Sequence, residues 1–334
     1  MKLSRSLLLM FVGIMFSAQA IGQAAASARY VQEYNSGNLQ NSLTLAREAL
    51  KAEPSNWHPH YYAGISLLNL GKEKDGVKML QKAVELNQTS APARAALAIG
   101  YLLRNDKKAT EEANAALKID KKNADANYVL AAMAIRNGSY NVAYDRSISA
   151  IAYAPKMSAA YFTKSQALVS SFIKQRGTVL KKESRSEMLN EAATDLEEYL
   201  RLEPKTRNFQ FYREYIESLR FFAEYYSRTE NKLPDPDASA EKTQPNKTPL
   251  KILAKRRAQY TDSARNAGIE GTLELLVGFS SDGTIKHVLL IKPLGYGLDE
   301  QAVAAAKAMK FEPETENGVP ISTVRPVSFG FHIR

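Results

Sequence analysis

The chain of 334 residues contains no cysteine, one tryptophan and only four histidines. Without cysteine it can form no disulfide framework and carry no cysteine-linked lipid anchor. His58 and His60 are the only local histidine pair, and Pro59 between them prevents both from lying on one helical face. Neither a Gly-x-Ser-x-Gly elbow nor a glycine-rich phosphate loop occurs. The sequence therefore predicts no metal site, no cofactor and no enzymatic activity.

Long apolar runs are also missing. The longest, Leu7 to Phe16, is shorter than the roughly 20 residues that a helix needs to span a bilayer. Lys2 and Arg5 precede it, and the small-x-small motif Ala18-Gln19-Ala20 follows. This layout predicts a signal peptide over residues 1–20 and therefore secretion. The alternative is an uncleaved N-terminal anchor.

Charge is plentiful but mixed. The formal net charge is +10, yet lysine and arginine are scattered among aspartate and glutamate. No basic stripe with interleaved aromatic residues is present, so nucleic acid is not an expected partner. The basic balance favours acidic partners or an anionic surface.

The middle of the chain is a repeat array. Small residues recur at spacings of 33 or 34 residues, in one series of alanines and in one series of turn residues. That period is typical of tetratricopeptide repeats, in which each repeat is a pair of helices. We expect a solenoid over residues 23–227 with four to five repeats. The two series are Ala49, Ala83, Ala116 and Ala150, and Gly37, Gly71, Asn105 and Gly138.

The end of the array departs from the regular period. Pro204 follows Pro155 by 49 residues rather than 34, and the extra residues lie near Lys174 to Glu187. They either lengthen two helices or add a loop. A last helix over residues 208–227 carries two apolar stripes, whereas a capping helix needs only one. The second stripe is Phe211, Tyr215, Phe222 and Tyr225. It either contacts the C-terminal part or a partner, or is simply partly exposed.

First helices of such repeats line a concave surface. Polar and aromatic side chains on that surface would suit binding of an extended or helical peptide. The alternative is that these residues are ordinary packed or solvated helix surface. The register set by the turn glycines gives the groove candidates Tyr34, Asn35, Tyr61, Asn69, Tyr128 and Arg136, followed by Phe162 and Gln166.

A polar stretch with several prolines separates the array from the C-terminal part. Residues 228–248 cannot bury apolar surface and are interpreted as a linker. From Lys251 to Ala267 the sequence indicates a short basic helix. Residues 249–334 form the expected C-terminal domain.

That domain begins with a hairpin. Leu273, Leu275 and Phe279 alternate on one face of the first strand. A three-residue loop ending at Gly283 would pair Phe279 with Ile285, Leu275 with Leu289, and Leu273 with Ile291, which puts apolar residues opposite one another.

A helix and a final strand complete the domain. Asp299 is a good N-cap candidate for a helix with a small-residue face. Pro326 lacks an N–H, so the last strand, which alternates from Arg325 to Ile333, is expected at a sheet edge.

This ordered set of motifs resembles the C-terminal domain of TonB-type energy transducers. The motifs, within residues 249–334, are Gly-Ile-Glu-Gly, the Asp-Gly hairpin, Gly-Leu-Asp-Glu-x-Ala, Lys-Phe-Glu-Pro, Asn-Gly-Val-Pro and Ser-Phe-Gly-Phe. The resemblance implies a periplasmic α+β domain whose last strand pairs with an N-terminal peptide of an outer-membrane transporter. Transducers of this type keep an N-terminal membrane helix with a polar Ser/His pair, and the apolar run of this chain contains no histidine.

The sequence thus predicts an all-α tetratricopeptide-type solenoid followed by a small α+β domain, acting as a periplasmic protein-binding protein in outer-membrane transport. The alternatives are a transducer anchored in the inner membrane and facing the periplasm, and a scaffold for envelope assembly unrelated to transport. The expected partner-binding residues of the edge strand are Arg325, Val327, Ser328, Gly330 and His332.

Overall fold

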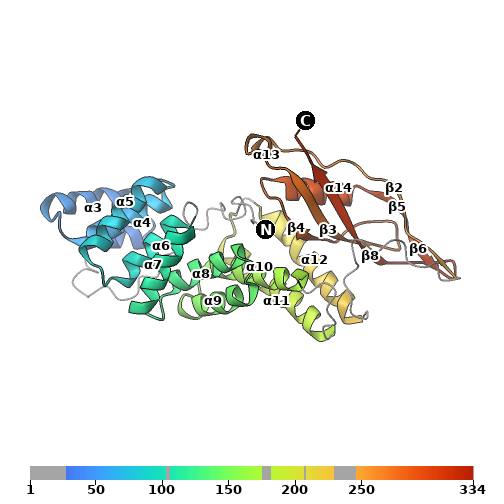
Figure 1. Cartoon of the computed structure of the whole chain (residues 1–334), viewed down its shortest axis with the longest axis horizontal. Helices are drawn as coiled ribbons and strands as arrows, with labels where there is room; N and C mark the ends of the chain where they lie inside the picture. The colour runs from blue at the N-terminus through green and yellow to red at the C-terminus, as the bar shows by residue number, and fades with distance from the viewer. Residues whose placement is uncertain (1–27, 103–105, 175–181, 207, 229–245, 334) are drawn as a thin grey trace. The chain divides into compact units, whose positions relative to one another are not determined.

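The computed structural model describes residues 28–102, 106–174, 182–206, 208–228 and 246–333. The expected signal peptide lies outside these residues. The described chain divides into two compact units, residues 28–164 and residues 165–333, and the division falls within helix α10 (Figure 1).

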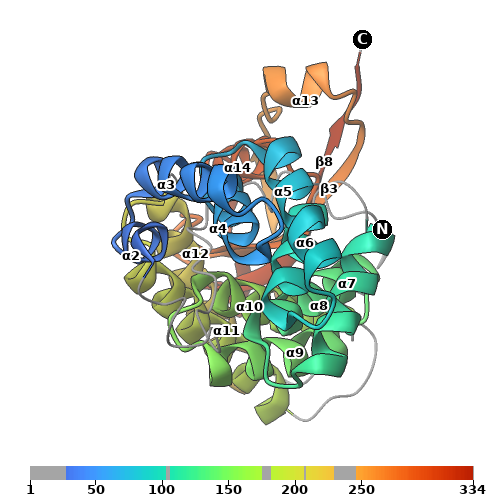
Figure 2. The ribbon, with the colours of Figure 1, turned by 90° about the vertical axis from the view of Figure 1, so that its left-hand side faces the viewer.

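The first unit is built from pairs of helices. Within it, α4, α6 and α8 follow one another as first helices of successive pairs, with contacts between α4 and α6 and between α6 and α8 (Figures 1 and 2). This stacking is the fold expected of a tetratricopeptide-type solenoid. Its helices are α2 (Arg29–Asn35), α3 (Leu39–Ala52), α4 (Trp57–Asn69), α5 (Glu73–Leu86), α6 (Ala91–Tyr101), α7 (Asp106–Ile119), α8 (Ala124–Arg136), α9 (Tyr140–Tyr153) and the start of α10 (Ser158–Lys174).

The repeat period has a physical basis in capping and packing. The side chains of Asn56 and Asn123 each accept a backbone N–H at the start of a first helix, and so satisfy one of its free donors. Ala83, Ala116 and Ala150 are fully buried where a second helix meets its first. Small side chains at these positions let the paired helices approach closely.

The second unit starts with longer helices. α10 has 17 residues and α11 (Lys182–Leu202) has 21, compared with 11 to 14 for α3 to α9. Both helices of the last pair are therefore longer than those of the earlier pairs, and residues 175–181 of the additional segment lie outside the described part of the chain. α12 (Phe209–Arg228) packs on α11 as the expected terminal helix.

The rest of the second unit is a small α+β domain. Three antiparallel sheets have the strand orders β1-β6-β7, β2-β5 and β4-β3-β8, and α14 covers the last of them. Its elements are β1 (Lys247–Thr248), β2 (Lys251–Ala254), α13 (Asp262–Asn266), β3 (Gly271–Phe279), β4 (Val288–Lys292), α14 (Leu298–Lys307), β5 (Lys310–Glu312), β6 (Glu314–Glu316), β7 (Val319–Ile321) and β8 (Thr323–Phe331).

The hairpin between β3 and β4 has the expected turn but not the expected register. Gly283 adopts a φ of +79°, and the N–H of Ser280 donates to the C=O of Thr284, which encloses a three-residue loop. Further along, Leu275 pairs with Leu290 rather than with Leu289. The pairing slips by one residue between the turn and β4, and slips again at Glu274, so the predicted pairs of Leu275 and Leu273 are wrong.

This slip changes which side chains of β4 face the domain core. Val288 and Leu290 lie on the side of Leu275 and Val277, whereas Leu289 and Ile291 are buried outside that core cluster. A one-residue shift exchanges the two faces of a strand. The β4-β3-β8 sheet is therefore apolar on both faces near β4, and the second face needs its own cover.

Other local predictions are also corrected. The stretch Lys251 to Ala267 holds strand β2 and the short helix α13 rather than one basic helix, because β2 pairs with β5. Strand β1 lies within the stretch interpreted as linker and pairs with β6. Asp299 is not the N-cap of α14. The N-cap is Gly297, whereas the carboxylate of Asp299 accepts hydrogen bonds from the N–H groups of Leu294 and Gly295.

Helix α12 covers the second face of the sheet. The N–H of Val288 donates to Ser218 Oγ at 3.3 Å, and Lys307 of α14 forms an ion pair with Glu214 at 2.5 Å. Of the second apolar stripe, Phe222 is fully buried. Burial raises the pKa of Tyr215, and the carboxylate of Asp299 adds to the shift, so this tyrosine lies beside α14. α12 thus belongs both to the helical pair and to the α+β domain.

Candidate partner-binding site

Strand β8 is an edge strand. It pairs with β3 along nine residues and has no partner among the described residues on its other side (Figure 1). The C=O of Ser328 accepts a hydrogen bond from a side chain outside the sheet, so it points away from β3. In an antiparallel pair the outward and inward groups alternate by residue. The backbone groups of Val324, Pro326, Ser328 and Gly330 therefore point outward.

The side chains of β8 divide between core and solvent. Val327, Phe329 and Phe331 are buried in the core of the domain, while Ser328 and Gly330 are exposed. His332, also exposed, follows the end of the strand. Of the predicted edge residues, Val327 thus packs its side chain in the core and directs its backbone groups to Leu275 of β3.

Arg325 is engaged within its own domain. Its guanidinium forms an ion pair with the buried carboxylate of Glu314 at 2.7 Å and donates to the C=O of Val324 at 3.2 Å. Leaving a buried carboxylate without its partner is costly. Arg325 therefore fixes the start of β8 and covers one of its outward carbonyls.

A second cation lies at the edge of β8. Lys255, which follows β2, donates from Nζ to the C=O of Ser328 at 2.7 Å. The same ammonium lies 4.8 Å from the centre of the Phe329 ring, within cation–π range. Burial lowers the pKa of Lys255. The sequence contained no signal for this residue, because the expected helix placed it away from any strand.

The groove candidates of the solenoid do not form one exposed row. Tyr61 and Tyr128 are buried, so their rings serve packing. The Asn69 side chain donates to the Tyr34 hydroxyl at 2.9 Å, and Arg136 forms an ion pair with Asp106. Of the three remaining candidates, Asn35 is exposed, Phe162 is buried and Gln166 is half-buried.

Beside these positions lies an aromatic cluster around a buried histidine. The Tyr30 hydroxyl is 2.8 Å from His58 Nδ1, and the rings of Trp57 and Tyr62 also contact the imidazole. Burial lowers the pKa of His58 to about 4. His60 lies outside the cluster, with Nε2 3.0 Å from the C=O of Pro54. Across the described residues, no group of three metal-ligating side chains comes together.

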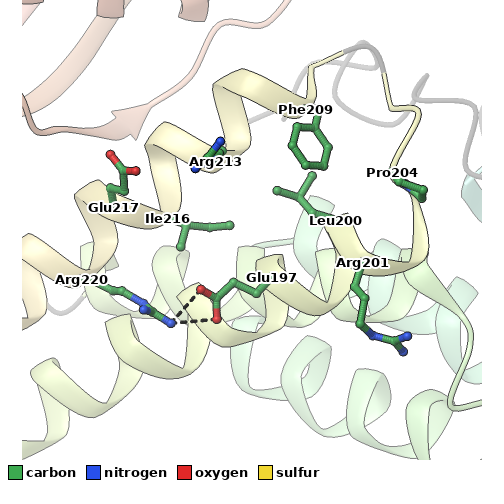
Figure 3. A pocket seen from close by; sticks show the side chains of 9 residues that line it. All are labelled: Glu197, Leu200, Arg201, Pro204, Phe209, Arg213, Ile216, Glu217 and Arg220. Carbon is green, nitrogen blue, oxygen red and sulfur yellow. Dashed lines mark hydrogen bonds and ion pairs between the residues drawn. The ribbon is translucent and has the colours of Figure 1, made fainter.

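A surface hollow of about 510 Å³ lies between α11 and α12 (Figure 3). Its floor is apolar, with Leu200 and Ile216, and the ring of Phe209 stands at its rim. Arg220 bridges it through an ion pair with Glu197 at 2.7 Å.

Comparison with known families agrees with this geometry. Residues 256–333 match the family of the Gram-negative bacterial TonB protein C-terminal domain. The match covers the β4-β3-β8 sheet, α13 and α14, and it ends beyond β8. It indicates an envelope-associated protein that binds protein partners. The TonB-type domain and the tetratricopeptide-type solenoid are both non-catalytic interaction modules.

Solved structures resemble the helical part at low identity. MamA is 21% identical over 53% of this chain and 95% of its own, with a TM-score of 0.38. The protein TTC0263 from Thermus thermophilus is 18% identical over 55% and 93%, with a TM-score of 0.43. YrrB, described as a TPR protein with an unusual peptide-binding site, is 14% identical over 55% and 88%, with a TM-score of 0.37. Likenesses this distant carry no functional argument.

Among curated proteins, no match to this chain was found. Within the described part of the chain, no helix is both long enough and apolar enough to cross a membrane.

Proposed function

We propose that this protein acts in the periplasm and binds an extended peptide of a protein partner along β8, in support of outer-membrane transport. The observation that carries the proposal is the outward row of backbone groups on an edge strand of a TonB-type domain. Main-chain hydrogen bonds from an added strand supply affinity, and side-chain pockets supply specificity. The solenoid would hold a second protein or position the domain.

The test removes one outward donor. Gly330→Pro deletes an N–H that points away from β3, so the β3-β8 ladder stays complete. Phe329 before it already has the extended backbone that a following proline requires. Binding of a transporter N-terminal peptide, measured by calorimetry, should be lost while the thermal melt is unchanged.

The matched control is Ser328→Ala, which keeps its backbone N–H and should bind normally. Full affinity of Gly330→Pro with an intact melt would show that the partner does not add to β8. The solenoid would then be the better candidate for the partner site.

The location is tested separately. A shortened form in the periplasmic fraction, with its N-terminus after the Ala18-Gln19-Ala20 motif, supports the proposed secretion. Recovery of the full-length chain in inner-membrane vesicles after a carbonate wash would instead support the anchored transducer.

A further inference from the structure

We propose that Lys255 makes the β8 edge selective for a strand that carries an acidic side chain opposite Phe329. The inference rests on the proposed function, since it concerns which peptides the same edge accepts.

The position of the ammonium creates the selection. Lys255 Nζ donates a hydrogen bond to the C=O of Ser328, which is one of the acceptors that an added strand needs. The charge also sits over the Phe329 ring. No ion pair of Lys255 occurs within the described part of the chain, so its partners there are this carbonyl and this ring. Because a carbonyl oxygen can accept two hydrogen bonds, a strand that pairs with β8 either shares this carbonyl with the ammonium or displaces it.

Sharing weakens, and displacement breaks, a charge-assisted hydrogen bond, which is stronger than a bond between neutral groups. The ammonium then needs a new acceptor close by. Residues that lie opposite each other on paired strands point to the same face, so the partner residue opposite Phe329 lies on the face where Lys255 stands. A carboxylate there replaces the lost acceptor, whereas a neutral side chain does not and a cation repels.

Lys251 offers a matched comparison. It lies four residues earlier, on β2, and its ammonium is 3.4 Å from Glu312 on β5. It is an exposed lysine of the same domain, and its ion-pair partner lies on β5 rather than on β8. The substitution Lys251→Met therefore reproduces the loss of one surface charge without changing the edge.

The experiment selects peptides on the full chain. A random library of ten-residue peptides is panned against the wild-type protein, and only peptides that lose binding to the Gly330→Pro variant are kept. We expect aspartate or glutamate to be enriched at one position. Replacing that residue by its amide should weaken binding by about tenfold.

The lysine variants then decide the role of the charge. Lys255→Met, which keeps most of the aliphatic stem over Phe329, should bind acidic and amide peptides equally. Lys255→Arg and Lys251→Met should keep the preference, and all three should melt like the wild type. A preference that persists in Lys255→Met, or no acidic enrichment, overturns this inference and leaves edge binding standing. A library without any peptide sensitive to Gly330→Pro overturns the proposed function and the inference with it.

Discussion

The ring of Phe221 stacks on the imidazole of His287, with ring centroids 4.3 Å apart and planes within 13° of parallel. Phe221 belongs to α12, and His287 immediately precedes β4. On its other side α12 packs against the helices, where Tyr226 contacts the ring of Phe172. One helix therefore packs against both the preceding helices and the β4-β3-β8 sheet.

The first prediction tests that contact. A β-carbon at Gly278 would lie 2.8 Å from Cε1 of Phe221, closer than real contacts allow. Gly278→Ala should lower the free energy of unfolding of the second unit by about 1–3 kcal/mol, measured by chemical denaturation. Removing the ring should relieve the clash, so Gly278→Ala should lower the free energy of unfolding less in a Phe221→Ala background than in the wild type. Equal costs in both backgrounds would mean that the two residues do not interact in solution.

The second prediction concerns cohesion. Proteolytic cleavage within residues 229–245 should leave two fragments, one ending with α12 and one beginning near β1. The Ser218 bond, the Glu214–Lys307 ion pair and the Phe221 stack should hold them together. Size-exclusion chromatography should show co-elution. Fragments that elute separately, each still folded by circular dichroism, would contradict the docking of α12.

The third prediction separates stability from binding on β8. Phe329 is 4% exposed, and Phe329→Ala should destabilise the domain by about 3–5 kcal/mol. The exposed neighbour Ser328 should tolerate alanine with a change within about 0.5 kcal/mol. Thermal melts of the two variants provide the measurement. Similar melts would show that the Phe329 ring contributes little to the core.

The fourth prediction is a pH dependence in the solenoid. Burial lowers the pKa of His58 from the ordinary 6.5 to about 4, so the unfolded chain binds a proton more readily than the folded one. Its contribution is fully present above pH 6.5 and is lost as the pH falls toward 4. His58→Phe removes this titration. The stability of wild type relative to His58→Phe should therefore decline between pH 6.5 and 4.5, and a constant difference would contradict the shift.

The sequence predicted the periodic features well. The repeat spacing led to the helix pairs, and Pro326 and the alternation after it led to an edge strand. Both rest on local chemistry that recurs at fixed intervals. Binding by the predicted residues of β8 and of the groove stays a prediction.

The failures share a cause, which is contact between distant segments. Nothing in the sequence near Leu289 reveals that it faces α12 rather than the domain core. The shifted register of β4 is stabilised by contact with a helix about 70 residues earlier in the chain. Phe221 belonged to neither predicted stripe. Lys255 reaches a carbonyl 73 residues further along the chain. The burial of Tyr61 and Tyr128 could not be foreseen either, because the neighbouring repeats that cover them cannot be placed from one helix.

The covered carbonyls of β8 also bear on solubility. An open strand edge is a template on which further copies can stack into aggregates. Here the C=O of Val324 is occupied by Arg325, Pro326 offers no N–H, and the C=O of Ser328 is occupied by Lys255. The groups left for an added strand include the N–H of Ser328 and both backbone groups of Gly330, so the edge suits one short peptide and discourages growth of a fibril.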